Sequence, residues 1–194
     1  MSKIFNAENH SRLSSEERRK LIPPEKILRM MHLQKGDVLL DAGAGKGYFA
    51  IPALEYVGDT GNVIAADISQ QMLDMLMSEA PGSLNLKTLL CEKDYIQLPE
   101  KTVDKILMAI VLHEVDDAVA YLIMLRSILK DDGKLFIVEW SPVESPMGPP
   151  LHERLSRETI EKYFSDAGFE MLRFEDVNNF QYFCEAEKTI DGQI

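Results

Sequence analysis

The sequence has few of the residues that build disulfide frameworks, zinc sites or membrane spans. Only two of its 194 residues are cysteines, Cys91 and Cys184, and they stand far apart with no Cys-x-x-Cys spacing. This argues against a disulfide scaffold and against a metal site, and it fits a reducing compartment. The longest purely apolar run extends only from Ile106 to Leu112, which is too short to cross a bilayer.

Basic residues are scarce relative to acidic ones. The chain has 21 Lys and Arg against 32 Asp and Glu, a formal net charge of -11. Nucleic acids and anionic membranes attract clustered positive charge, so we expect neither as a partner. The basic cluster Arg18-Arg19-Lys20 follows two glutamates and is expected to form a solvated helix face. The first residues lack the apolar segment of a secretory signal, so a cytoplasmic location is expected, while a homodimer stays open.

What is present is the composition of an ordinary folded domain, with 45% hydrophobic and 27% charged residues. From residue 37 onward, short runs rich in β-branched residues alternate with segments of helical periodicity. That alternation is typical of an α/β fold, in which helices cover both faces of a parallel sheet. We expect strands at residues 37–41, 63–67, 84–91, 103–109 and 134–139, with helices near 47–57, 69–80 and 118–129.

The last third of the chain has a different pattern. A proline-rich stretch at 141–150 is followed by a helix that Ser156 can cap and that Gly168 ends. The runs 169–177 and 180–187, separated by two asparagines, predict an antiparallel hairpin that adds one reversed strand to the sheet edge. At the other end, two short helices are expected before residue 37, near 14–20 and beside Pro23-Pro24, as a cover or lid.

A glycine-rich segment, VLLDAGAGKGYF at 38–49, joins the first strand to the first helix of this core. The strand ends in Asp41, and Gly43, Gly45 and Gly47 follow at alternate positions. Glycines let a ligand approach the backbone, and the first amides of the next helix offer unpaired donors to an anionic or polar group. Tight packing of a strand against a helix is the alternative explanation for such a turn.

A second acidic residue ends the next strand, VIAAD at 63–67. A carboxylate there, at Asp67, can accept hydrogen bonds from ribose hydroxyls, as it does in dinucleotide-binding folds. A nicotinamide site also needs the pattern G-x-G-x-x-G, but Tyr48 stands where the third glycine should be. A nicotinamide-dependent oxidoreductase is therefore the weaker alternative.

The glycine-rich segment and the strand that ends in Asp67 resemble motifs of the class I S-adenosylmethionine-dependent methyltransferases. Three later segments match further motifs of that family: KDYIQLP at 93–99, MAIVLHEV at 108–115 and LKDDGKL at 129–135. The resemblance extends from about residue 37 to 188 and is to the small-molecule branch, which includes quinone-ring and arsenite methylators. It implies a Rossmann-like, doubly wound, mostly parallel seven-stranded sheet with helices on both faces. It also implies one domain, 1–194, with a helical N-terminal cover (1–35), a cofactor-binding core (36–140) and a substrate loop, helix and terminal hairpin (141–188).

The resemblance implies S-adenosyl-L-methionine as the cofactor and assigns residues to it. The turn after the first strand would hold the methionine part, Asp67 the ribose, and residue 68 and the KDYIQLP segment the adenine. In that segment Lys93 replaces the family's glycine, and in LKDDGKL two aspartates replace a proline and a glycine. The implied cofactor-binding residues are Asp41, Gly43, Ala44, Gly45, Gly47, Asp67, Ile68, Asp94, Tyr95 and Ala109.

Methyl transfer from a sulfonium is an in-line displacement, so holding the acceptor in a site closed to water supplies most of the catalysis. A base is needed only when the acceptor arrives protonated. The candidate is His113, which follows the fourth strand at the sheet edge where ligands of such folds bind. The alternative is a structural histidine that caps or pairs with the neighbouring Glu114, Asp116 or Asp117.

Two residues at the end of the fifth strand, Glu139 and Trp140, offer a carboxylate and an aromatic wall to an acceptor. A tryptophan packed under the proline-rich loop is the alternative. The polar run His152-Glu153-Arg154 is expected to form surface salt bridges rather than to meet the acceptor. Phe5, Arg12 and Tyr48 would close over the cofactor if the N-terminal helices act as a lid.

The resemblance implies a small-molecule acceptor, and the sequence does not choose among O, N, C and S acceptors. Arsenite methylation needs several thiols, and two distant cysteines do not favour a thiol cage. Quinone-ring methylation would need a wide apolar pocket near His113 and Trp140. A non-catalytic protein that binds S-adenosylmethionine is a further alternative, because intact cofactor motifs do not prove turnover.

Overall fold

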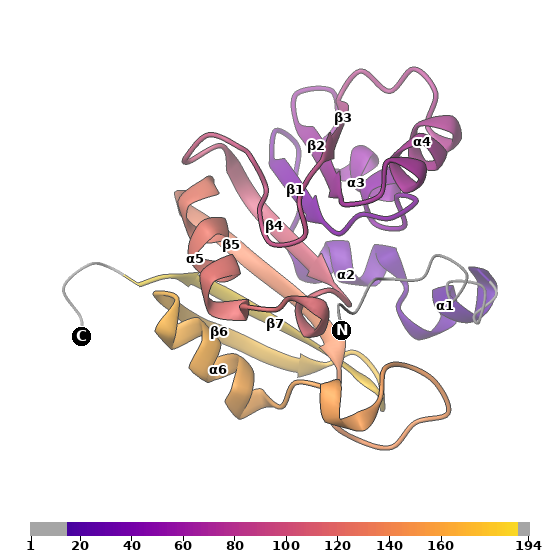
Figure 1. Ribbon diagram of the computed structural model, residues 1–194. Helices are drawn as coiled ribbons and strands as arrows, with labels where there is room; N and C mark the ends of the chain where they lie inside the picture. Colours follow the sequence, from indigo (N-terminus) through magenta and orange to yellow (C-terminus); the bar gives the residue numbers. More distant parts are fainter. Residues whose placement is uncertain (1–14, 190–194) are drawn as a thin grey trace.

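A seven-stranded sheet runs through the computed structural model, which describes residues 15–189 (Figure 1). The strands are β1 (Val38–Ala42), β2 (Asn62–Asp67), β3 (Leu86–Leu90), β4 (Val103–Ala109), β5 (Leu129–Trp140), β6 (Phe169–Asp176) and β7 (Gln181–Lys188). Their order is β3-β2-β1-β4-β5-β7-β6, and all pairs are parallel except those that β7 makes with β5 and β6. The expected doubly wound α/β fold is confirmed.

Helices cover both faces of this sheet. They are α1 (Ser15–Leu21), α2 (Pro24–Met30), α3 (Ala50–Val57), α4 (Gln70–Glu79), α5 (Ala118–Ile128) and α6 (Arg157–Asp166), with short 3-10 turns at Leu112–Glu114 and Leu151–Glu153. One buried cluster joins α5 and α6 to one face, and a second joins α2 and α3 to the other (Figure 1). Phe5, Arg12 and the expected helix start at residue 14 lie outside the described residues.

Capping residues set where several helices begin. The side chain of Asp117 accepts a hydrogen bond from the amide of Ala120 at 2.9 Å, and Ser156 accepts from Thr159 at 3.2 Å. Each bond satisfies a donor that the first helical turn leaves unpaired. The predicted cap at Ser156 is confirmed, and the helix that it starts ends before Gly168, as expected.

Two element boundaries differ from the sequence-based expectation for local reasons. The first core helix begins at Ala50 rather than at 47, because the glycine turn continues through Phe49. Strand β5 begins at Leu129 rather than at Lys134. Leu129 already pairs with Val103, and the register then shifts before Lys134 joins the ladder, so residues 130–133 form an irregular step within the strand.

The terminal hairpin is present, but its reversed strand is not at the outer edge. Strand β7 lies between β5 and β6, and β6 takes the edge. The difference follows from side-chain character, because β7 is buried along most of its length whereas β6 is largely half-buried or exposed. In the connecting turn, the side chain of Asn178 accepts hydrogen bonds from the amides of Phe180 and Gln181, at 2.8 and 3.2 Å.

The topology brings several chain segments to one edge of the sheet. Strands β1, β2, β4 and β5 all end there, because they are parallel. Strand β7 is antiparallel to β5 and therefore begins at the same edge with Gln181, opposite Trp140. Within residues 15–189, no helix is long and apolar enough to cross a membrane.

Candidate functional site

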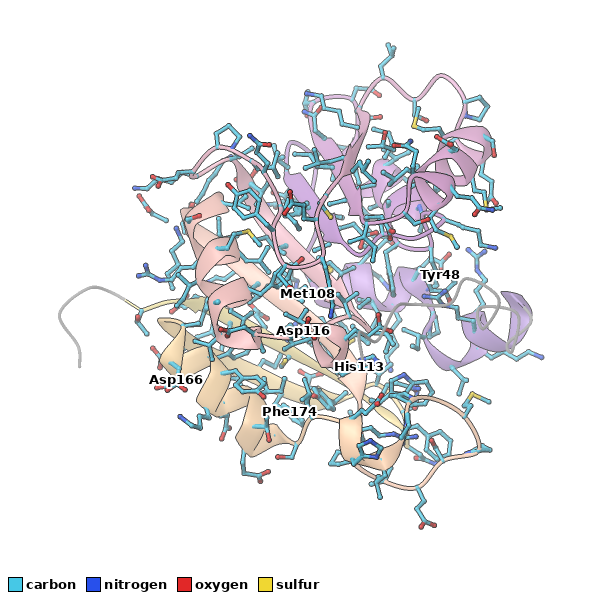
Figure 2. All side chains as sticks on the ribbon, viewed as in Figure 1. Tyr48, Met108, His113, Asp116, Asp166 and Phe174 are labelled. Atoms are coloured by element: carbon cyan, nitrogen blue, oxygen red, sulfur yellow. The ribbon has the colours of Figure 1, made fainter. Side chains whose placement is uncertain are left out.

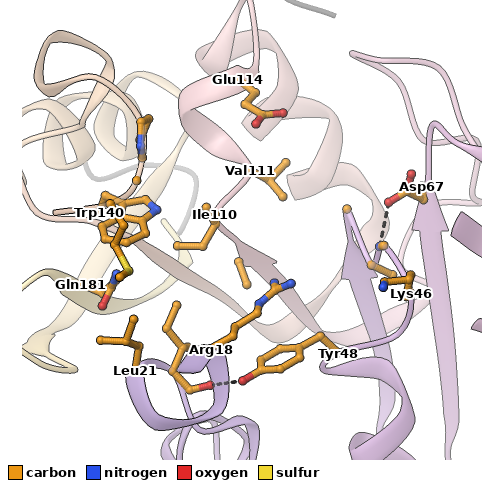
Figure 3. A pocket seen from close by; sticks show the side chains of 18 of the residues that line it. Arg18, Leu21, Lys46, Tyr48, Asp67, Ile110, Val111, Glu114, Trp140 and Gln181 are labelled. Atoms are coloured by element: carbon orange, nitrogen blue, oxygen red, sulfur yellow. Dashed lines mark hydrogen bonds between the residues drawn. The ribbon is translucent and has the colours of Figure 1, made fainter. Parts of the chain in front are cut away.

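A cavity of about 1670 Å³ opens along this edge (Figure 3). Its walls come from the glycine turn after β1, the ends of β2, β4 and β5, the first residue of β7, helix α1 and the loop 141–150. Sites for one small ligand usually occupy roughly 300–1,000 Å³. The cavity therefore has room for a cofactor and an acceptor side by side.

The glycines of the turn have different surroundings. Gly43 has φ +84°, and a Cβ there would lie 2.4 Å from Cγ2 of Val111, so the turn packs tightly against the segment after β4. Gly45 has φ +55°, and a Cβ there would meet nothing within 4 Å. Gly43 thus serves close packing, while Gly45 leaves the backbone open toward the cavity. The turn therefore packs tightly at Gly43, while ligand binding at Gly45 stays a prediction.

Asp67 links the two strand ends that frame the cavity. Its Oδ2 accepts a hydrogen bond from the amide of Gly45 at 2.8 Å (Figure 3), and its Oδ1 accepts one from the amide of Ser69 at 2.8 Å. Each carboxylate oxygen has a second lone pair, so further donors can bind. Asp67 and the neighbouring Ile68, which is 49% exposed, both line the cavity.

Asp41 lies beneath the turn and does not line the cavity. Its side chain is buried, and its Oδ2 has no hydrogen-bond partner within the described residues. Burial raises the pKa of Asp41 to about 7, with a further contribution from Asp67, while the amide of Ala50 and the charge of Arg18 oppose the rise. A positive charge bound at the turn would favour the ionised form of this carboxyl group.

The expectation of a fully solvated basic cluster was wrong for Arg18. Helix α1 lies at the cavity, and the guanidinium of Arg18 sits 4.2 Å from the ring centroid of Tyr48 (Figure 3). Burial lowers the pKa of Arg18, although Tyr48 and Asp41 oppose this. The hydroxyl of Tyr48 donates to the carbonyl of Ile22 at 2.8 Å. Only the packing of α1 on the core decides which of its basic residues faces inward.

At the other end of the cavity, Trp140 both packs under the loop 141–150 and lines the cavity. Its side chain is 5% exposed, and a Cβ on Gly148 would lie 2.9 Å from its ring, so the loop backbone rests on the indole. Arg154 holds the loop from the side. Its guanidinium donates to the carbonyls of Pro149 and Met147 at 3.0 and 3.1 Å.

Arg154 makes further bonds to the same loop, to the hydroxyl of Ser145 at 2.8 Å and to the carbonyls of Ser141 and Val143. Its role is therefore to fasten the loop, which differs from the expected surface salt bridge. His152 remains largely exposed beside Glu153, with 3.8 Å between His152 Nε2 and Glu153 Oε1.

His113 and Glu139 form a buried pair that does not line the cavity. Both oxygens of Glu139 lie 3.0 Å from Nδ1 of His113, and they also accept hydrogen bonds from the amides of His113 and Trp140. Burial alone would lower the pKa of His113, but the hydrogen bond and charge of Glu139 outweigh it and raise the pKa. The partner is thus Glu139, whereas Glu114 lies 3.8 Å from Nε2.

Strand alternation explains why neighbours at the end of β5 differ. Successive side chains point to opposite faces, so Trp140 faces the cavity while Glu139 points to the α5 side. His113, labelled in Figure 2, comes from the turn after β4 at the same edge. Its Nδ1 lies 3.0 Å from Oε1 of Glu139. Periodicity alone could have predicted that one of the two residues would miss the cavity.

Some lining residues differ from those that the family resemblance implied. Asp94 and Tyr95 are exposed and do not line the cavity, whereas Cys91 and Lys93 of the same loop do. Lys93 forms an ion pair with Asp116 at 2.6 Å. Among residues 15–189, no group of three or more His, Cys, Asp or Glu is placed to hold a metal ion.

Two cavity residues carry no signal in the sequence. Ile110, directly after β4, has φ +61°, an unfavourable conformation for a β-branched residue, and its amide donates to Val138 at 2.8 Å. Gln181 is fully buried, and neither the oxygen nor the nitrogen of its side chain has a hydrogen-bond partner among residues 15–189. A glutamine after a turn has no local pattern that would distinguish it from an ordinary surface residue.

Comparison with known proteins places these features in context. A family model described as a methyltransferase domain matches residues 40–137. The chain is 30% identical over 161 residues to the demethylmenaquinone methyltransferase of Lactobacillus johnsonii, covering 81% of this chain and 63% of that protein. It is 28% identical over 178 residues to the ubiquinone/menaquinone biosynthesis C-methyltransferase UbiE of Cellvibrio japonicus, covering 84% and 66%.

A solved structure is similar over nearly the whole chain. The crystal structure of a SAM-dependent methyltransferase from Aquifex aeolicus has a TM-score of 0.87 and 30% sequence identity, covering 94% of this chain and 98% of that one. The chain spans about two thirds of the length of the curated relatives that it matches, at 63% and 66%.

Proposed function

The chain belongs to the class I S-adenosylmethionine-dependent methyltransferases, and from this we propose that it transfers a methyl group from S-adenosylmethionine to a small-molecule acceptor. The observation that carries the proposal is the cavity, which joins the glycine turn and Asp67 to a second, loop-covered end at Trp140. Similarity to demethylmenaquinone and ubiquinone/menaquinone methyltransferases supports a quinone-type ring as the acceptor.

The residues at the first end fit the cofactor. The open backbone at Gly45 admits a ligand, and the unpaired Oδ2 of Asp41 can be compensated by positive charge at the turn. We propose that Asp67 and Ile68, which line the cavity, hold the ribose and the adenine. We propose the turn from Gly43 to Gly47, together with Ala109, for the methionine part; Asp94 and Tyr95 remain predictions outside the cavity wall.

S-adenosylmethionine supplies a methyl group on a sulfonium, so the acceptor needs an electron pair on the far side of that methyl. The work of the chain is to align the acceptor and to keep water away. Helix α1 and the loop 141–150 contribute to the cavity walls, and Arg154 keeps that loop in place. These elements position the reactants without forming a covalent bond to either.

We assign His113 and Glu139 a positioning role rather than direct contact with the acceptor. The pair ties the turn after β4 to the end of β5, where Trp140 begins the acceptor end. Glu114 lines the cavity, and burial raises its pKa, which makes it the better-placed carboxylate for an acceptor that arrives protonated.

The cysteines support a quinone-type acceptor over arsenite. Cys91 lines the cavity, where burial raises its pKa to about 11, whereas Cys184 is buried in β7 within the core. One thiol in the cavity does not form the cage that arsenic needs. We further propose that the chain works on small molecules in the cytoplasm rather than on nucleic acid, and that residues 1–35, 36–140 and 141–188 act as cover, cofactor core and acceptor part of one domain.

Calorimetric titration of S-adenosylmethionine tests the cofactor site. Asp67→Ala should weaken binding by about 1.5–3 kcal/mol, the scale of lost hydrogen bonds to a charged group. Asp74→Ala, an exposed position on α4, should bind as the wild type does. Equal affinities in the Asp67 variant would remove that residue from the site, and NADH binding in place of S-adenosylmethionine would favour the nicotinamide alternative.

Transfer of labelled methyl groups to a short-chain demethylmenaquinol tests the acceptor class and separates an enzyme from a protein that only binds the cofactor. Labelled product is the expected result. Cofactor binding without transfer to this ring, followed by transfer to another metabolite of a cell extract, would keep the methyltransferase proposal and replace the acceptor.

A further inference from the structure

Gln181 is a polar residue of the cavity wall to which the cofactor assignment gives no role. It is 0% exposed, and in the described part of the chain neither Oε1 nor Nε2 has a hydrogen-bond partner. A buried amide without partners costs free energy, and such groups are rare in folded proteins. Because Gln181 also lines the cavity, a bound molecule can supply the missing partners.

The backbone around Gln181 is fixed. The backbone amide of Gln181 donates to Asn178 Oδ1 at 3.2 Å. Its backbone carbonyl accepts from the backbone amides of Val177 and Asn178 at 2.8 and 3.3 Å. Gln181 pairs with Trp140 across the strands, so the two side chains lie on the same face of the sheet. Figure 3 shows both in the cavity wall, with Leu21 of α1 nearby in the view.

The position of Gln181 separates it from the cofactor turn. Strand β1 leads into the glycine turn, and β4 and β5 lie between β1 and β7. Three steps of about 4.8 Å give a separation of roughly 14 Å between the turn and Gln181 along the sheet. The free amide therefore lies at the end of the cavity where Trp140 and the loop 141–150 form the wall.

The chemistry of this end limits what the amide can recognise. Leu21, Ile110, Trp140 and Met147, which also line the cavity, have largely apolar side chains. The guanidinium of Arg154 is already bonded to the loop 141–150. A neutral amide offers N–H donors and one carbonyl acceptor, which do not compensate a full charge in a buried site. Its fitting partner is a neutral oxygen substituent, a carbonyl or a hydroxyl, on an otherwise apolar ring.

We propose that Gln181 is a specificity residue that binds a ring oxygen of the methyl acceptor, an assignment that rests on the proposed function. The side chain lets the cavity distinguish an oxygenated ring from an apolar ring of the same size. The side-chain amide of Gln181 donates to a carbonyl oxygen through Nε2 and accepts from a hydroxyl through Oε1.

Binding of two matched ring compounds tests this assignment. The probes are 2-prenyl-1,4-naphthoquinone and 2-prenylnaphthalene, titrated into full-length protein saturated with S-adenosylhomocysteine. We expect the wild type to prefer the quinone by about tenfold or more, the scale of hydrogen bonds to a buried group. Gln181→Met keeps length and packing but removes both polar atoms, so most of that preference should disappear. Gln97→Met, at an exposed position, should retain it.

Stability separates recognition from a structural role. Since the side chain of Gln181 has no hydrogen-bond partner among residues 15–189, Gln181→Met should leave the unfolding midpoint unchanged or raise it, and S-adenosylhomocysteine affinity should not change. A clearly lower midpoint, a preserved quinone preference in the variant, or no quinone preference in the wild type would each overturn the assignment while cofactor binding stands. Failure of the wild type to bind S-adenosylhomocysteine would instead refute the proposed function.

Discussion

Asp41 and Asp67 end neighbouring strands, yet their carboxylates have different surroundings. Asp67 lies at the cavity and accepts two backbone hydrogen bonds, whereas Asp41 is buried with one oxygen unpaired. The first arrangement shapes a binding surface. In the second arrangement the charged form of Asp41 is unfavourable, because burial beneath the turn raises its pKa to about 7.

The raised pKa of Asp41 predicts how stability changes with pH. Its ordinary value is 3.8. The folded state therefore holds the proton more tightly than the unfolded chain, and the stability that this provides is lost as pH rises from about 4 through 7. Asp41→Asn stays neutral, so in the absence of ligand its stability relative to the wild type should improve by roughly 2–3 kcal/mol between pH 5 and pH 8.

Urea unfolding at both pH values measures this difference. Asp59→Asn, an exposed aspartate after α3, is the matched control and should follow the wild type. Parallel pH profiles of the wild type and the Asp41 variant would show that the carboxyl group is ionised at little cost in the folded protein.

At the scale of elements, the loop 141–150 depends on one side chain that comes from outside it. Arg154 bonds to carbonyls and a hydroxyl spread along the loop, and the loop in turn rests on Trp140 through Gly148. Proline and glycine give this segment no ladder of its own. The shape of the loop is therefore set by the guanidinium of Arg154 and by the indole of Trp140 beneath it.

Arg154→Lys keeps the charge but loses the planar fork of donors, which a lysine cannot replace at several acceptors at once. We expect faster hydrogen exchange of the loop amides and a several-fold higher KM for the acceptor, with S-adenosylmethionine affinity unchanged. The control is Arg157→Lys, whose exposed side chain pairs with Glu161 on α6. An unchanged KM with a loosened loop would show that the loop does not help to hold the acceptor.

At the scale of the molecule, one sheet edge gathers every part of the cavity, so a bound cofactor contacts segments from separate strands. A ligand that binds only the folded state stabilises it by about 2.7 kcal/mol at a hundredfold excess over Kd. For a chain of this length that raises Tm by roughly 5–10 °C.

Thermal unfolding with S-adenosylmethionine should show this shift, whereas NADH at the same concentration should show none. The Asp67→Ala variant should need more cofactor to reach the same shift. A shift with NADH and none with S-adenosylmethionine would contradict the cofactor assignment for the whole molecule.

The local pattern of the sequence determined much of the fold. Hydrophobic runs and helix signals predicted the α/β class and most of the strands, because periodicity and capping act over a few residues. The glycine turn and Asp67 also stood out, since a short contiguous segment carries their chemistry. Even the terminal hairpin was visible in two extended runs around a pair of asparagines.

Only the tertiary structure decided which side chains meet. The order that places β7 inside the sheet brings Gln181 beside Trp140, and the packing of α1 turns Arg18 toward Tyr48. The pairing of His113, in the turn after β4, with Glu139 of β5 likewise has no local signal. Such contacts depend on long-range packing and on the face to which each side chain points, and these are properties of the assembled sheet rather than of any short segment.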